Sequence, residues 1–453
     1  MSRTSLRRCL IALGTAGVLV LATGASSLAS AQAHRFPASS RFYTPPPNPG
    51  ALTQIASLAR AHQFRDAALL SRMVTTPQAA WFTSGTPDEV RAGVRRTVTD
   101  AARRGTVPVL VAYDIPFRDC AQYSAGGALD TAAYLAWIDG FARGIGRQRA
   151  IVLLEPDSLG IIPFNSDING NAEWCKPADQ TGNPQPGASP AERYAALNGA
   201  VDRLERQPGT SVYLDGTHSA WLGAGDAADR LVKAGVQRAQ GFFLDVSNYQ
   251  TTPRQQKFGT WISSCIAFAN NPADGGWRLG HYGWCGSQYF PANPNDFSTW
   301  GLTDQWYANN LGTAVPTVHF VVDTSRNGQG PNDMTGYAKA PFNQPAGVVS
   351  SLAGGSWCNP PGAGVGLRPT ARTGVALLDA YLWVKIPGES DGSCDIAGGA
   401  RAWDYTAYNP WQLTGSAQQH FDPLWGMVDP AAGQWFPAQA LQLAQRADPP
   451  PGR

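Results

Sequence analysis

The amino-acid sequence predicts an α/β protein built on a parallel β-sheet, either closed into a barrel or open. Short apolar runs recur along the chain, with helix-start signals between them. This alternation is typical of a parallel sheet covered by helices. The composition supports a packed fold, because 43% of the residues are hydrophobic and only 15% are charged. Disordered chains are rich in charge and poor in apolar residues, so that class is excluded.

The first 33 residues predict a secretory signal peptide. Three arginines near the start precede an apolar stretch from about Leu10 to Ala22, and the small residues of 29–33 offer a cleavage site. The apolar stretch is shorter than the ~20 residues that a helix needs to cross a membrane. We therefore expect a secreted, extracellular protein that is not held in a membrane. Arg7 and Arg8 leave both Sec and twin-arginine export open.

Six cysteines follow this segment. An even number in an exported protein predicts up to three disulfides, and the spacing alone leaves their pairing open. No two of the six have C-x-x-C spacing, so we expect no zinc site. The six are Cys120, Cys175, Cys265, Cys285, Cys358 and Cys394.

The rest of the chain predicts one large domain. Residues 34–41 begin an extended lead-in whose proline-rich character continues to residue 50, and residues 448–453 form a proline-rich tail. No second linker and no repeated unit separates them. We therefore assign residues 42–447 to a single domain, and we expect a monomer.

The predicted strands are short apolar runs bounded by turn residues. They are rich in Val, Ile, Leu or Phe, as strands buried on both faces of a parallel sheet are. They cover residues 107–113, 150–154, 211–214, 241–244 and 315–322.

Helix-start signals lie between these strands. Thr86 and Glu89 form a capping-box pattern, which predicts a helix that ends near Gly105. Asp130 predicts the N-cap of a helix that continues through Phe141. Residues 189–192 repeat the capping-box pattern before a further helix over 193–206.

Acidic residues follow one predicted strand after another. The C-terminal ends of the strands in a β/α barrel share one face, and that face holds the active site. We therefore expect a cleft lined by several carboxylates, although Asp245 and Asp323 are equally consistent with helix N-caps. The acids are Asp114, Asp119, Glu155, Asp157, Asp215, Asp245, Asp323, Glu389 and Asp391.

Other catalytic signatures are missing from the sequence. It contains no H-E-x-x-H motif, no G-x-S-x-G elbow and no phosphate loop of Walker type. Asp215 and His218 are a weak pair of candidate metal ligands, so we expect no metal and no cofactor. The formal net charge of +2 gives no reason to expect nucleic acid or an anionic membrane as a partner.

Carboxylates together with aromatic side chains favour glycoside hydrolysis. One acid protonates the leaving oxygen, while another carboxylate activates water or attacks the sugar. Aromatic rings cover the apolar faces of sugar rings, and the chain has 15 Trp, 14 Tyr and 17 Phe. A secreted, nearly neutral protein of this composition suits a neutral polysaccharide.

Four longer motifs stand in order along the chain: YDIPFRDC (113–120), LEPDSL (154–159), YLDGTHSAW (213–221) and WVKIPGESDG (383–392). Shorter ones, SNY (247–249) and WCN (357–359), fall between the last two. Together they resemble glycoside hydrolase family 6, the inverting β-1,4-glucanases and cellobiohydrolases. The resemblance covers roughly residues 42–447. It implies a distorted, partly open parallel β/α barrel, TIM-like but with fewer than eight strands.

The resemblance implies roles for three aspartates. Asp157 matches the general acid, which stays protonated near neutral pH through burial or nearby negative charge. Asp119 matches the residue that raises the pKa of this acid. Asp391 matches the base, acting directly or through a chain of waters. An inverting enzyme keeps the acid and base carboxyls ~6.5–9.5 Å apart. Glu155 is expected to support the structure.

The resemblance also implies a set of substrate-binding residues. Tyr113 matches a residue beside the distorted sugar ring, and Trp81 lies in a looser motif. The serine of the family's mobile loop falls on Ser124 or Ala125, and Ser390 stands where some members carry cysteine. The set is Trp81, Tyr113, Asp215, His218, Trp221, Asn248, Trp357, Lys385 and Glu389.

The family pattern further implies which cysteines pair. Cys120–Cys175 and Cys358–Cys394 match its two disulfides. Cys265 and Cys285 are then left for the third.

The expected function is that of a secreted endo-β-1,4-glucanase, a cellulase that hydrolyses β-1,4-glucosidic bonds with inversion. The loops after Cys120 and between Asp391 and Trp403 look short, which favours an open cleft and endo action on cellulose or a soluble glucan. The alternatives are a cellobiohydrolase of the same family, which releases cellobiose from chain ends, a carbohydrate-binding protein without catalysis, and a metal-dependent polysaccharide hydrolase.

Overall fold

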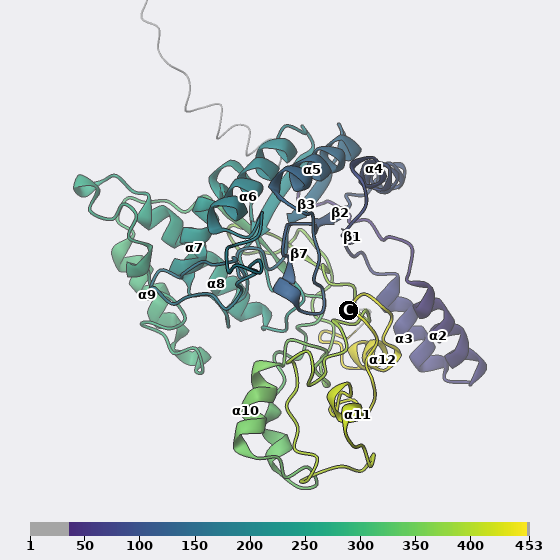
Figure 1. Cartoon of the computed structure of the whole chain (residues 1–453). Helices are drawn as coiled ribbons and strands as arrows, with labels where there is room; N and C mark the ends of the chain where they lie inside the picture. The colour runs from purple at the N-terminus through teal and green to yellow at the C-terminus, as the bar shows by residue number, and fades with distance from the viewer. Residues whose placement is uncertain (1–35, 451–453) are drawn as a thin grey trace, which may run out of the picture.

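Seven parallel strands form one sheet in the computed structural model, which describes residues 36–450 (Figure 1). The strands pair in chain order, and the sheet curls into an open barrel. Its two edges approach where the Ala79 amide donates to the Trp383 carbonyl at 2.9 Å. The expected partly open barrel with fewer than eight strands is confirmed. The strands are β1 (Ala80–Phe82), β2 (Val109–Ala112), β3 (Ala150–Leu154), β4 (Thr210–Asp215), β5 (Gly241–Leu244), β6 (His319–Asp323) and β7 (Leu378–Leu382).

The strands are apolar because both faces of the sheet are covered. Inside the barrel, Val109 and Val111 of β2 pack in one core with Ile151 and Leu153 of β3. The alternating residues, such as Leu110, belong to the larger core that the sheet forms with the helices. Successive side chains of a strand point to opposite faces, so each strand contributes to both cores.

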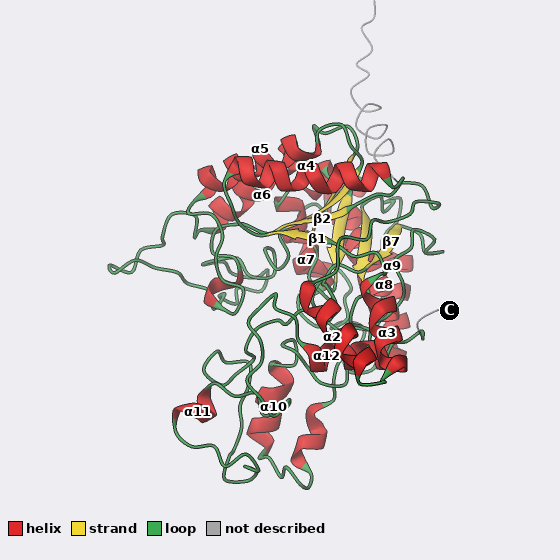
Figure 2. Cartoon of the chain, turned by 90° about the vertical axis from the view of Figure 1, so that its right-hand side faces the viewer, coloured by secondary structure: helices red, strands yellow, loops and turns green. Residues whose placement is uncertain are grey.

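Helices α4 to α9 surround the sheet (Figures 1 and 2). The capping boxes predicted at Thr86 and Ser189 are both present. Asp130 caps α5 as predicted, but the helix continues beyond Phe141 to Ile145. The helices are α4 (Pro87–Arg103), α5 (Thr131–Ile145), α6 (Pro190–Leu204), α7 (Ala224–Lys233), α8 (Thr252–Ala269) and α9 (Gly301–Asn310).

The N-terminal segment joins the sheet and then forms two helices that the sequence pattern did not predict. Phe42 forms a parallel bridge with Val107, just before β2. The extended lead-in ends earlier than expected, because Pro49 begins α2 and the Asn48 side chain caps it. α2 and α3 pack against α12 (Figure 1). Their bounds are α2 (Pro49–Arg60), α3 (Phe64–Val74) and α12 (Pro437–Gln445).

Residues 331–356 and 392–430 form a lobe beside the sheet, which we call the aromatic lobe (Figures 1 and 2). It contains α10 (Ala346–Gly354) and the single turn α11 (Ser416–Gln419). Its core includes Trp403, whose ring centre lies 5.8 Å from that of Tyr337 and 6.1 Å from that of Phe342. Many of the aromatic residues noted in the composition therefore serve this core.

The three expected disulfides are all present, as Cys120–Cys175, Cys265–Cys285 and Cys358–Cys394. The first ties the loop after β2 to the loop after β3. Within residues 36–450, no helix has the length and apolar character needed to cross a membrane. The predicted signal peptide at residues 1–33 lies outside the described residues.

Candidate active site

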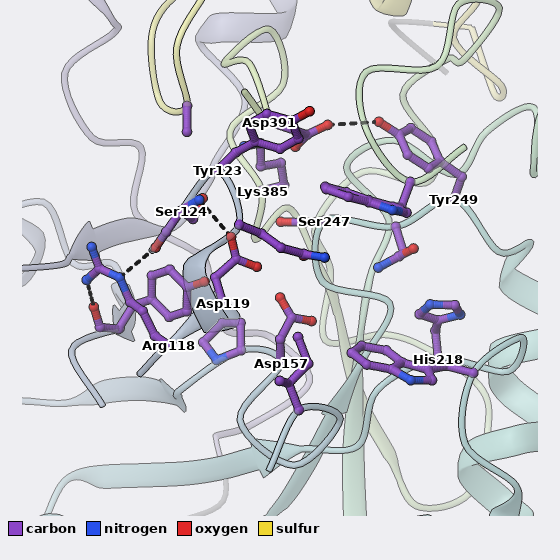
Figure 3. A pocket seen from close by; sticks show the side chains of 18 of the residues that line it. Arg118, Asp119, Tyr123, Ser124, Asp157, His218, Ser247, Tyr249, Lys385 and Asp391 are labelled. Atoms are coloured by element: carbon purple, nitrogen blue, oxygen red, sulfur yellow. Dashed lines mark hydrogen bonds and ion pairs between the residues drawn. The ribbon is translucent and has the colours of Figure 1, made fainter. Parts of the chain in front are cut away.

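A cavity of about 810 Å³ lies at the C-terminal ends of the strands (Figure 3). In Figure 3 the carboxyl groups of Asp119 and Asp157 face the same space. All of the catalytic and substrate-binding residues predicted from the sequence, except Asp215, line this cavity. They are Trp81, Tyr113, Asp119, Asp157, His218, Trp221, Asn248, Trp357, Lys385, Glu389 and Asp391.

Several residues just after the strands adopt left-handed backbone angles although they are not glycine. The φ angle is 56° at Glu155, 64° at Asp157, 60° at Thr217 and 60° at Ser247. These angles are unfavourable for residues with a Cβ atom. They persist where the surrounding structure holds them, mostly at functional sites. The strained backbone therefore points to the loops after β3, β4 and β5.

Asp157 is suited to hold a proton. Burial raises the pKa of Asp157 well above the usual range for an aspartate, and the negative charges of Asp215, Asp119 and Asp391 raise it further. A neutral carboxylic acid beside ionised carboxylates is the state that a general acid requires.

Asp119 lies on the loop after β2, next to the disulfide at Cys120. Burial raises the pKa of Asp119 to about 6, although the Ser124 amide and Arg118 act in the opposite direction. The Ser124 amide donates to the Asp119 carboxylate at 2.7 Å. Asp119 is therefore largely ionised at neutral pH, and its charge acts on Asp157.

Asp391 is held as a carboxylate. The buried Arg326 donates to its two oxygens at 2.9 and 2.7 Å, and Nζ of Lys385 lies 3.1 Å from Oδ1. Burial pushes the pKa of Asp391 upward, but Arg326 and Lys385 outweigh it and hold the pKa below the usual value. Because donors occupy both oxygens, direct proton abstraction by Asp391 requires one donor to give way.

Two buried acids support the loops around Asp157. Oδ2 of Asp215 accepts from the Leu159 amide at 3.2 Å, so this carboxylate lies beneath the cavity and contacts the loop that carries Asp157. The sequence had placed Asp215 among the substrate-binding residues. Glu155 accepts two bonds from the Asp114 amide, at 3.1 and 3.0 Å, which agrees with a supporting role.

Asp245 and Asp323 are not helix N-caps, so that alternative is wrong for both. Asp323 accepts from the amides of Val384 and Lys385 at 3.0 Å each. Asp245 accepts from the Gln250 amide at 3.1 Å, whereas the N-cap of α8 is a different residue. The Asp323 carboxylate thus ties the loops after β5 and β7 together, whereas Asp245 holds its own loop against α8.

Three tryptophans supply flat surfaces to the cavity. A Cβ atom at Gly160 would come within 2.3 Å of the Trp221 ring, so glycine makes room for this indole. Nε1 of Trp81 donates to a backbone carbonyl at 2.8 Å, and its ring meets the Tyr113 ring edge-on at 5.5 Å. Trp357 lines the cavity beside the Cys358–Cys394 disulfide.

His218 is a neutral hydrogen-bond donor at neutral pH. Burial lowers the pKa of His218 to about 4. Its Nδ1 accepts from the Ala220 amide at 3.2 Å, so the ring proton resides on Nε2. The ring centre lies 5.7 Å from that of Trp221. His218 can therefore donate to a hydroxyl beside an aromatic surface without adding charge.

The remaining predicted polar residues are held by local bonds. Oε1 of Glu389 accepts from Nδ2 of Asn48 at 2.9 Å, and burial raises the pKa of Glu389. Nζ of Lys385 donates to the Ser390 carbonyl at 3.2 Å. Nδ2 of Asn248 lies 3.3 Å from a neighbouring carbonyl. These contacts fix the polar groups before any ligand arrives.

The cavity also involves residues that the sequence did not indicate. Tyr123, Trp174 and Tyr249 line it, and Trp174 is 55% exposed. Arg326 contacts Asp391 as described above. A signal for Arg326 existed, since it follows closely after the sixth strand. None existed for Trp174, which lies in a long loop between a strand and a helix.

The loops after Cys120 and after Asp391 meet at Tyr123. The Tyr123 hydroxyl accepts from the Asp395 amide at 3.0 Å. The Tyr123 side chain packs closely on Gly392 and Gly398: a Cβ atom added at these glycines would lie 2.4 Å from the Tyr123 Cβ and 2.2 Å from its hydroxyl oxygen. The sequence predicts that these loops are short and leave the cleft open; in the structure they touch at Tyr123.

An uncharged acid, ionised carboxylates and flat aromatic surfaces in one cavity define a glycoside hydrolase. The family model for glycosyl hydrolases family 6 matches residues 37–447, and the chain belongs to this family.

Relatives of this chain include both endoglucanases and cellobiohydrolases. This chain is 33% identical over 330 residues to endoglucanase 1 of Streptomyces sp. (strain KSM-9), and the match covers 72% of this chain and 67% of that protein. It is 31% identical over 386 residues to endoglucanase A of Thermobispora bispora, covering 84% of this chain and 64% of that protein. It is 29% identical over 383 residues to the 1,4-beta-D-glucan cellobiohydrolase CEL6A of Podospora anserina, covering 81% and 63%. The chain thus spans about two thirds of the length of these relatives.

Among solved structures, the endoglucanase Cel6 of Mycobacterium tuberculosis is similar, with a TM-score of 0.57 and 30% identity. The match covers 90% of this chain and 97% of that one. That enzyme was solved in complex with methyl-cellobiosyl-4-deoxy-4-thio-beta-D-cellobioside.

Proposed function

We propose that this protein hydrolyses β-1,4-glucosidic bonds in cellulose or a soluble glucan, with inversion at the anomeric carbon. The observation that carries this proposal is the contrast within one cavity between Asp157, whose pKa is raised, and Asp391, whose pKa is lowered. The substrate class is supported by the names of the relatives, which are endoglucanases and cellobiohydrolases.

In this mechanism Asp157 gives its proton to the glycosidic oxygen as the bond to the anomeric carbon breaks. A water molecule attacks that carbon from the opposite face, and its proton passes to Asp391 directly or through further waters. The negative charge of Asp119 raises the proton affinity of Asp157 and stabilises the positive charge that develops on the sugar. Asp391 then releases its proton to solvent, and solvent returns a proton to Asp157.

Substrate binding combines stacking with hydrogen bonds. Trp81, Trp221 and Trp357 offer ring faces to the sugar units, and Tyr113 lies beside the reacting ring. Polar contacts to sugar hydroxyls come from His218, Asn248, Lys385 and Glu389. Asp215 contributes to binding indirectly, because it holds the loop that carries Asp157.

Product stereochemistry tests the reaction. NMR of freshly released product should detect the α-anomer first, and a β-anomer would contradict inversion. Asp157→Asn should lower kcat on cello-oligosaccharides by ~10²–10⁴-fold while leaving binding intact. Asp202→Asn, at an exposed position outside the cavity, is the control. A carbohydrate-binding protein without catalysis would bind glucan and release no reducing ends, and loss of activity with a chelator would favour the metal-dependent alternative.

Endo action is our first choice, because several of the relatives are endoglucanases. The contact between Tyr123 and Asp395 favours a second candidate, a cellobiohydrolase, because joined loops hinder entry of the middle of a polymer. Rapid loss of viscosity of carboxymethylcellulose would support endo action. Steady release of cellobiose without that loss would support the second candidate.

We further propose that residues 1–33 are removed on secretion and that residues 42–447 act as one catalytic domain. Three disulfides suit an oxidising extracellular environment. N-terminal sequencing of the secreted protein tests the cleavage, and light scattering tests the expected monomer. A mature protein that begins at Met1 would contradict the first proposal.

A further inference from the structure

A second pair of buried carboxyls lies behind Asp391, outside the cavity lining. Asp422 and Asp429 are 0% and 4% exposed, and their carboxyl groups hydrogen-bond to each other. Two carboxyls can share such a bond only if one of them carries a proton. Arg401 donates to the two oxygens of Asp422 at 3.0 and 2.8 Å, which keeps the negative charge there. The proton therefore resides on Asp429.

The surroundings of Asp429 agree with this assignment. Its buried Oδ1 meets no conventional donor among the described residues. Its Oδ2 accepts from Nδ2 of Asn359 at 3.0 Å. Burial, followed by the charge of Asp422, raises the pKa of Asp429 to about 8, and Arg401 acts against this. Asp422 and Arg401 are the charged groups that act on it.

Asn359 connects this pair to the cavity. Its backbone amide donates to Oδ2 of Asp391 at 3.0 Å, and its Oδ1 accepts from the Asp391 amide at 2.9 Å. Asn359 is completely buried and has a φ angle of +36°, which asparagine tolerates better than most residues. With Oδ1 occupied, Nδ2 is the donor toward Asp429, and it also lies 2.9 Å from the Ser390 hydroxyl and 3.0 Å from the Gly392 carbonyl. The acceptor on Asp429 is thus the only carboxyl oxygen among the three acceptors that anchor Nδ2 of Asn359, the residue that binds Asp391.

We propose that Asp429 is a positioning residue for Asp391: as a neutral carboxylic acid it anchors Asn359, and Asn359 fixes the Asp391 carboxylate at the cavity. The inference rests on the proposed role of Asp391 in the reaction. Asp429 itself does not touch the substrate. If Asp429 were ionised, two like charges would face each other in a buried place and force the carboxyls apart.

Two substitutions distinguish the effect of the proton on Asp429 from the effect of its side chain. Asp429→Asn replaces the O–H donor by an N–H donor and keeps a carbonyl for Asn359, so it imitates the neutral acid at every pH. We expect kcat and KM for cellopentaose near those of the wild type at pH 6. Asp429→Ala removes both groups, and we expect kcat to fall by up to ~100-fold with KM little changed.

The pH dependence of stability supplies a second readout that does not depend on catalysis. Since the pKa of Asp429 is raised in the folded protein, the wild type loses stability as the pH rises toward and through about 8. Asp429→Asn has no such proton to lose. The Tm of this variant minus that of the wild type should therefore grow between pH 5 and pH 9. Asp333→Asn, at an exposed position in the aromatic lobe, should show no such growth.

Two results would overturn the proposal: an Asn variant as inactive as the Ala variant, or a Tm difference that stays constant with pH. These can be told apart from failure of the proposed function, which would appear as undiminished activity in Asp391→Asn. If Asp429→Ala does not fold, the kcat of Asp429→Asn and the pH dependence of its Tm still test the proposal.

Discussion

Arg326 and Asp391 form a buried ion pair that joins the loop after β6 to the loop after β7. Their side chains are 0% and 7% exposed. The ring of Tyr249 lies 4.4 Å beneath the guanidinium carbon of Arg326. Arg326 and Lys385 together therefore stabilise the negative charge of Asp391 in the interior.

Replacing Arg326 with Met should destabilise the protein by about 3–5 kcal/mol, because it removes the bidentate partner of a buried carboxylate and leaves only Lys385 as a cation beside it. Activity should fall as well, since Asp391 would then take up a proton. Urea unfolding at pH 6 measures the first effect. Arg238→Met is the matched control, because the Arg238–Asp202 pair is about half exposed and should contribute less than about 1 kcal/mol. Equal losses for both variants would contradict this account.

Gly160→Ala should raise KM for cello-oligosaccharides, because the new Cβ would displace the Trp221 ring. The effect on the free energy of unfolding should be smaller than the effect on binding, since the ring can move into the cavity. Gly347→Ala in α10 is the control: nothing lies within 4 Å of a Cβ atom there. This control should leave KM unchanged and slightly stabilise the helix. An unchanged KM in Gly160→Ala would argue against Trp221 as a sugar platform.

Relative to the wild type, the Asp119→Asn variant should be more stable at high pH than at low pH. The pKa of Asp119 is raised to about 6 in the folded protein, above the ~3.9 of an unfolded chain. The folded wild type therefore binds the proton more tightly and loses stability as the pH rises from about 4 to 6. The Tm of the variant minus that of the wild type should grow over this window and then level off. A Tm difference that shrinks with rising pH would contradict a raised pKa for Asp119. Activity should fall at every pH.

Removing two different disulfides should separate stability from catalysis. The double Ser variant of Cys265 and Cys285 should lose about 2–4 kcal/mol of stability and keep its kcat at 25 °C. The double Ser variant of Cys120 and Cys175 should lose kcat as well, because that bond positions the loop of Asp119. The test is to measure kcat of both double variants at a temperature at which both are folded. Equal kcat values would show that the loop needs no covalent tie.

The central strands could be predicted because their burial leaves a continuous apolar run in the sequence. β1 is only three residues long, so it carries no periodic signal. The predicted run at 315–322 began too early, since β6 starts at His319. The prolines at 45–49 concealed the start of α2, and α3 follows it without a side-chain cap that would have signalled it.

The candidate site could be predicted where its residues directly follow strands, since topology alone brings strand ends together. Trp174 and Asn359 lie in loops far from a strand end, and only tertiary packing carries Trp174 to the cavity and Asn359 to Asp391. The aromatic lobe is a similar case: Tyr337 and Trp403 are distant in the sequence and meet in one core. The direction of each pKa shift also needed the structure, because it depends on burial and on neighbouring charges.

The bond between Asn48 and Glu389 spans 341 positions of the chain. Protein synthesis runs from the N-terminus, and contacts of such long range form only after the intervening chain is available. Lys385, Glu389 and Asp391 leave the ribosome after all seven strands have been made, since β7 ends at Leu382. We therefore expect a nascent chain to hold the strands of its barrel before it has a complete cleft, so that hydrolytic activity appears only after these three residues have been made.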